Sequence, residues 1–84
     1  MRTRHRRTLQ RIFATPTPSD IRWAEIESML RAAGVEVSER AGSRVGLSKE
    51  GERITVHRPH PHPEAGRATV RAIARFLDNI GVRP

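Results

Sequence analysis

The chain has 84 residues, enough for one domain with a small hydrophobic core. It contains no cysteine, which excludes disulfides, thiolate catalysis and cysteine-ligated zinc. No apolar run approaches the roughly 18 residues of a membrane span, and the N-terminus lacks the apolar region of a signal peptide, so we expect a cytoplasmic protein without a membrane partner. The net charge of +7 comes almost wholly from arginine, which favours nucleic acid or an acidic protein surface as the partner.

The N-terminus is a basic arm, because the first nineteen residues carry five arginines and no acidic residue. Within it, residues 3–13 place Leu9, Ile12 and Phe13 at helical spacing, which predicts a short amphipathic helix. The helix should end before a linker with two prolines, because residues that precede proline disfavour helix. The basic side of this helix could contact RNA, or the segment could cover one edge of the core.

Two further helices are predicted from apolar residues at helical spacing. The first covers about residues 21–33, with Ser19 or Asp20 as its N-cap and Gly34 at its end. The second covers about residues 67–80 and is closed by Gly81. Its core stripe is Val70, Ile73, Leu77 and Ile80, and the stripe of the first is Trp23, Ile26, Leu30 and Ala33. The single tryptophan could stack on a base, but its helical spacing favours a core position.

Between these helices, apolar and polar residues alternate at period two, which predicts antiparallel strands at about residues 35–40, 43–49 and 52–58. After the first helix and its linker, the order is therefore α-β-β-β-α. This order defines an α+β fold with helices on one face of a three-stranded sheet and the other face open. We divide the chain into residues 1–18, the basic helix with its proline linker, and residues 19–84, the main domain.

The register of the second and third strands follows from a two-residue turn at Glu50 and Gly51. This turn places all four apolar residues of the two strands on one face of the sheet. It also sets Arg44 directly opposite His57 on the other face, with Cβ atoms about 5 Å apart. A cation and an imidazole would then share one site of the size of a phosphate.

Three histidines, His57, His60 and His62, follow each other closely in a proline-rich segment. Imidazole binds zinc, but Glu64 is the only nearby carboxylate, so we expect incidental metal affinity and no functional metal or other cofactor. Cleavage of RNA without a metal needs a base for the 2′-hydroxyl, an acid for the leaving 5′-oxygen and cations for the phosphorane. Imidazole suits both proton roles. We therefore predict His57, His60 and Arg44 as catalytic residues.

Arginines near the hairpin and on the last helix are the predicted RNA-binding residues. On the helix they recur every four residues, and like charges at this spacing destabilise a helix slightly unless an anion or acidic partner meets them. A solvated surface is the alternative. The predicted set is Arg44, Arg53, Arg58, Arg67, Arg71 and Arg75.

Three short motifs occur in a fixed order. They are Gly42-Ser43-Arg44, then Ile54-Thr55-Val56 before the Pro/His segment, then Ala68-Thr69-Val70-Arg71-Ala72-Ile73 at the start of the last helix. In order and spacing they resemble the HicA (YcfA-like) family of bacterial toxins, whose patterns run Gly-Ser-His, Thr-Val-Pro with a His, and Gly-Thr-Val/Leu-Arg/Lys-x-Ile. The resemblance covers about residues 22–82.

This resemblance implies a fold similar to double-stranded RNA-binding domains, endoribonuclease activity on messenger RNA, and a HicB-like antitoxin as partner. The family's catalytic histidine falls on Arg44, which binds phosphate but cannot transfer protons near neutral pH. One hypothesis is that His57 takes the proton-transfer role, assisted by His60 or His62. The alternative is an inactive module that binds RNA or an acidic antitoxin. A third possibility, an RNA-binding domain unrelated to toxins, would be favoured if the first helix covered the open sheet face and a helix surface were left basic.

Overall fold

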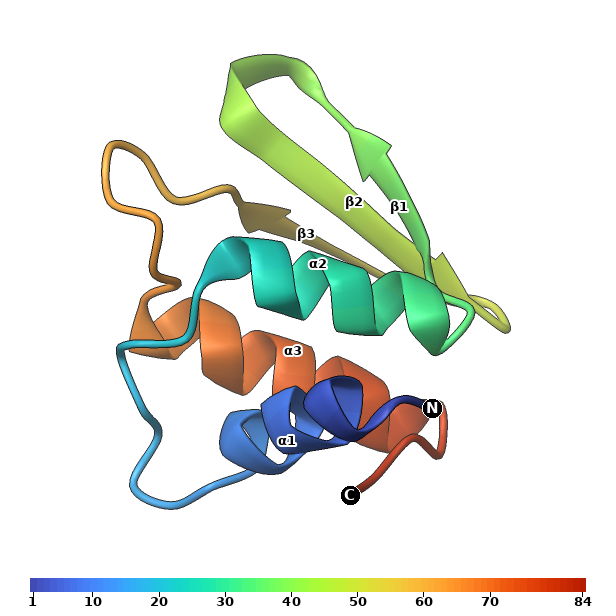
Figure 1. Ribbon diagram of the computed structural model, residues 1–84. Coiled ribbons are helices and arrows are strands. Elements are labelled where there is room, and N and C mark those ends of the chain that lie inside the picture. Colours follow the sequence, from blue (N-terminus) through green and yellow to red (C-terminus); the bar gives the residue numbers. More distant parts are fainter.

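The helices and the sheet form three layers in the computed structural model, which describes residues 1–84 (Figure 1). A three-stranded sheet packs against α2 and α3, and α1 packs against these two helices. The elements are α1 (Thr3–Ile12), α2 (Trp23–Ala32), β1 (Glu36–Glu39), the 3₁₀ helix η1 (Ala41–Ser43), β2 (Arg44–Lys49), β3 (Glu52–His57) and α3 (Arg67–Asn79). The predicted α-β-β-β-α order with an extra N-terminal helix is confirmed.

The sheet is antiparallel in the order β1-β2-β3, with β2 in the middle. The two residues that connect β2 and β3 both have positive φ, 52° at Glu50 and 83° at Gly51, as a tight primed turn requires. The turn sets the predicted register, in which Arg44 lies opposite His57. The apolar residues Val45, Leu47, Ile54 and Val56 share the face that meets the helices.

The core lies between the sheet and the α2/α3 pair and extends to α1. Its fully buried side chains include Ile26, Met29, Leu30, Val45, Leu47, Val70, Ile73, Phe76 and Leu77. From α1, Leu9 and Ile12 are also buried in it. The first helix therefore covers part of the core on the helical side and leaves the open sheet face uncovered, so the condition that favoured an unrelated RNA-binding domain is not met.

Helices α2 and α3 each end at a glycine with positive φ, as predicted. Gly34 has a φ of 83°, and the N–H of Val35 donates to the carbonyl of Leu30 at 2.9 Å. After α3, Gly81 has a φ of 76°, and the same type of bond links residues 82 and 77. This is the Schellman geometry, which needs a left-handed residue just after the helix. After α2, this geometry reverses the direction of the chain, and β1 begins at Glu36.

The start of α2 differs from the prediction. Neither Ser19 nor Asp20 caps the helix; the N-cap residue is Arg22, which makes no capping hydrogen bond with its side chain. Instead, the N–H of Trp23 donates to the carbonyl of Pro63 at 2.8 Å. The segment before α3, which forms a single isolated bridge between Glu64 and Arg22, thus supplies the acceptor that a local side chain was expected to supply.

Candidate active site

Arg44 and His57 face each other at the end of the β2–β3 hairpin that lies away from the turn. The N–H of Arg58 donates to the carbonyl of Ser43 at 2.8 Å, so the next pair of residues along the ladder is hydrogen-bonded. Because the two kinds of pair alternate in antiparallel strands, Arg44 and His57 form a non-hydrogen-bonded pair, with Cα atoms about 4.5 Å apart. Both residues are exposed on the open sheet face. One small ligand can therefore contact both side chains.

The guanidinium of Arg44 is tethered to the turn that precedes β2. Its Nε donates to the carbonyl of Ala41 at 3.0 Å. Gly42 and Ser43 both have positive φ, 70° and 61°, and these left-handed residues bend η1 back toward Arg44. The bond uses Nε and leaves the two terminal amino groups as donors for a phosphate.

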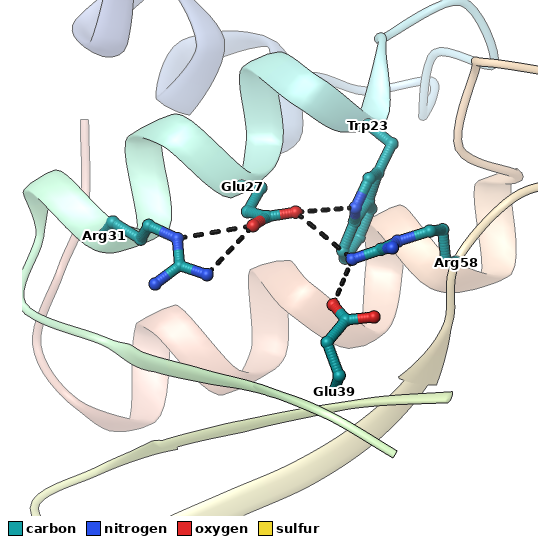
Figure 2. A network of polar contacts seen from close by, with 5 residues as sticks. All are labelled: Trp23, Glu27, Arg31, Glu39 and Arg58. Atoms are coloured by element: carbon teal, nitrogen blue, oxygen red, sulfur yellow. Dashed lines mark hydrogen bonds and ion pairs between the residues drawn. The ribbon is translucent and has the colours of Figure 1, made fainter. Parts of the chain in front are cut away.

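Arg58 follows His57 in the chain and is tied to two other elements (Figure 2). It forms ion pairs with Glu39 of β1 and, at 3.6 Å, with Glu27 of α2. Its Nε is buried without a hydrogen-bond partner. Two carboxylates therefore compensate the charge of this predicted RNA-binding residue within the fold. The same contacts fix the end of β3, where His57 lies.

Glu27 is the centre of this network (Figure 2). One carboxylate oxygen accepts a hydrogen bond from Nε1 of Trp23 at 3.1 Å, and the other accepts one from Nη2 of Arg31 at 3.0 Å. Trp23 is only 6% exposed and belongs to the core cluster. The predicted core position of the tryptophan is confirmed, and its ring is not presented to a base.

The other predicted RNA-binding arginines lie on two different sides of the molecule. Arg53 lines a groove on the open sheet face. On α3, Arg67 donates from Nε to the carbonyl of Thr17 at 3.0 Å, and Arg71 and Arg75 line a hollow beside the end of α1. These three arginines are thus on the helical side, away from the open sheet face.

His60 and His62 are exposed in the loop that leads from β3 to α3, drawn in orange in Figure 1. No three His, Cys, Asp or Glu side chains lie close enough together to hold one metal ion. His57 is the one histidine of the three that strand pairing holds opposite a cation. A catalytic role for His60 stays a prediction.

A fourth histidine, His5, had no predicted role. It is 8% exposed between α1 and α2, with Nε2 placed 2.9 Å from Oγ of Ser28 and Nδ1 buried without a partner. Its position four residues before Leu9 puts it on the buried stripe of α1. Helical spacing alone could therefore have placed this polar side chain on the buried face of α1.

Arg40 and Gly46 were also not singled out. The guanidinium of Arg40 lies over Gly46, in the middle of β2 on the open sheet face. A glycine inside a strand often marks a close approach by another group, and this was the available signal. The sequence could not show which side chain makes the approach.

Together, these features define a small α+β domain that presents a guanidinium and an imidazole on the open face of its sheet. A model of the family described as the HicA toxin of bacterial toxin-antitoxin matches residues 23–82, which is most of the chain. The chain therefore belongs to the HicA toxin family, as its motifs predicted. The match includes Arg44 and His57 and begins after α1. No curated protein and no solved structure matches the chain, and none of its helices has the length and apolar character needed to cross a membrane.

Proposed function

We propose that the chain is the toxin of a type II toxin–antitoxin pair, cleaves messenger RNA as a metal-independent endoribonuclease, and is neutralised by a HicB-like antitoxin. Membership in the HicA family supports the pairing with an antitoxin. The observation that carries the proposed chemistry is the pairing of Arg44 with His57 on an exposed strand end. It provides a phosphate-binding cation and a proton-transfer group at one site.

The proposed reaction uses the substrate's own 2′-hydroxyl as the nucleophile. A base removes its proton, the 2′-oxygen attacks the adjacent phosphorus, and the bond from phosphorus to the 5′-oxygen breaks. The leaving 5′-oxygen takes up a proton, so the products are a 2′,3′-cyclic phosphate and a 5′-hydroxyl. His57 acts as general base or acid, and His60 is the proposed second proton-transfer group. Arg44 compensates the negative charge that builds up on the phosphorane.

The imidazole of His57 lies close to the position at which the family pattern has its catalytic histidine. The motif places the family's catalytic histidine where this chain has Arg44. Its cross-strand neighbour carries an imidazole instead, and facing side chains of an antiparallel pair have Cβ atoms about 4.5–5.5 Å apart. The imidazole is thus moved by one step across the hairpin and stays on the same face.

Incubation with a labelled single-stranded RNA in excess EDTA tests this function. We expect the wild type to cleave, and His57→Ala to lose at least about 100-fold in rate, the usual contribution of a general acid or base. Gln10→Ala, on the exposed side of α1, is the control and should cleave like the wild type. Full activity of His57→Ala would contradict the assigned role.

A second candidate function is binding without cleavage. Arg44 favours it, because an arginine stands where the family has its proton-transfer residue. The protein would then use its positive charge to bind RNA or an acidic antitoxin. In the same assay, this function predicts that the wild type binds the RNA and leaves it intact.

A further inference from the structure

The open sheet face is organised in three rows that run across the strands. The row nearest the β2–β3 turn is Glu36, Ser48 and Arg53; the middle row is Ser38, Gly46 and Thr55; the third is Arg40, Arg44 and His57. Arg40 joins the third row through its backbone N–H, which donates to the carbonyl of Arg44 at 2.8 Å. Successive rows are two residues apart along the strands, or about 7 Å.

Arg40 places a cation at the centre of this face. Its side chain extends from the third row to the middle row, where a Cβ on Gly46 would meet Nε at 2.9 Å and Nη2 at 3.0 Å. The missing side chain of the glycine makes this position possible. None of the ion pairs of the structure includes Arg40, Arg44 or Arg53. These three arginines therefore have no carboxylate partner. Arg53 lies in the row nearest the turn, the side chain of Arg40 extends into the middle row, and Arg44 lies in the third row.

The groove around Arg40 carries small hydroxyl side chains. The groove has a volume of about 490 Å³; Glu36 contributes one carboxylate to its lining, and Ser38, Ser48 and Thr55 contribute hydroxyl groups. These groups and the guanidinium can donate hydrogen bonds to phosphate and ribose oxygens. The one tryptophan and both phenylalanines of the protein lie in or against the core, so the imidazole of His57 is the only ring on this face on which a base could stack. The chemistry of the groove thus fits a sugar–phosphate backbone better than bases.

We propose that single-stranded RNA crosses the open sheet face, with successive phosphates at Arg44, Arg40 and Arg53. The row spacing is comparable with the separation of successive phosphates in an extended strand, and the hydroxyl groups lie between the cations. This inference rests on the proposed function and specifies how its substrate lies. His57 acts on the phosphate at one end of the track, and Arg40 is a binding residue one phosphate away. Cleavage should then depend little on sequence.

Binding of an uncleavable RNA tests the track separately from the chemistry. The probes are fluorescent 2′-O-methyl oligonucleotides of two, four and eight nucleotides, with anisotropy measured over a range of salt. Gly46→Ala displaces the guanidinium of Arg40 and the hydroxyl of Ser38 without changing the charge, because the three atoms nearest to the added Cβ all belong to these two side chains. Arg40→Gln removes the charge. The matched control is Arg83→Gln, which loses one charge near the end of α3, where Arg83 is paired with Asp78. Circular dichroism confirms that each variant is folded.

We expect Gly46→Ala and Arg40→Gln to weaken binding of the four-nucleotide probe by about tenfold, the effect of losing one charge-assisted contact. Arg40→Gln should also reduce the slope of log Kd against log salt concentration by the amount that about one phosphate contact contributes. Arg83→Gln should change neither quantity. Affinity should rise from two to four nucleotides, since four nucleotides supply the three phosphates of the track.

Equal binding by Arg40→Gln, Gly46→Ala and Arg83→Gln would overturn the track, even if the wild type cleaves RNA. Loss of binding in the first two variants would support the track, even if no variant cleaves. A labelled oligoglutamate of eight residues distinguishes RNA from an acidic protein. If it binds as tightly as the eight-nucleotide RNA and loses as much affinity in Arg40→Gln, the face is an acidic-protein docking surface and the proposal is wrong.

Discussion

Arg44 and His57 form one cross-strand pair on the exposed face of the β2–β3 hairpin. Each residue is held by a different neighbour: Arg44 by the carbonyl of Ala41, and His57 through the anchored Arg58 that follows it. The two side chains thus start from fixed backbone positions while their functional groups remain exposed. The proposed function assigns phosphate binding to the guanidinium of Arg44 and proton transfer to the imidazole of His57 on the opposite strand.

The ion pairs of Arg58 should stabilise the site end of the sheet. We expect Arg58→Ala to lower the free energy of unfolding by about 1–3 kcal/mol, because Glu27 and Glu39 lose a partly buried partner. Arg31→Ala removes a more exposed partner of the same Glu27 and should cost less than about 1 kcal/mol. Urea denaturation measures both values. Equal losses in the two variants would show that Arg58 is not a special anchor.

Packing of α1 on the other helices should contribute to global stability. Ile12 is 2% exposed in the core cluster, so we expect Ile12→Ala to cost about 2–5 kcal/mol. Gln10→Ala, on the exposed side of the same helix, should stay within about 0.5 kcal/mol of the wild type. Thermal or urea unfolding provides the comparison. If Ile12→Ala unfolds like the wild type, α1 is an appendage rather than part of the core.

The hairpin register could be predicted because a two-residue turn fixes which residues face each other. Once Glu50 and Gly51 were identified as the turn, parity alone placed Arg44 opposite His57. The ends of the helices were predictable for a similar local reason, because Gly34 and Gly81 supply the left-handed residue that each C-terminus needs.

Contacts between distant segments could not be predicted in this way. The first N–H of α2 bonds to Pro63 rather than to a local cap, because the segment before α3 runs beside the helix start. The partners of Arg58, Glu27 and Glu39, come from two other elements, and sequence spacing does not bring them together. The path of Arg40 over Gly46 depends on side-chain geometry in the folded sheet.

Exchange of the two site residues tests the central claim, that Arg44 and His57 act together at one site. The single variant His57→Arg removes the imidazole, and the double variant Arg44→His with His57→Arg returns it to the opposite strand of the same pair. Cleavage of single-stranded RNA in EDTA is measured for both. We predict that the single variant is inactive and that the double variant regains at least about tenfold in rate. Undiminished cleavage by the single variant, or no recovery in the double variant, would contradict a shared site.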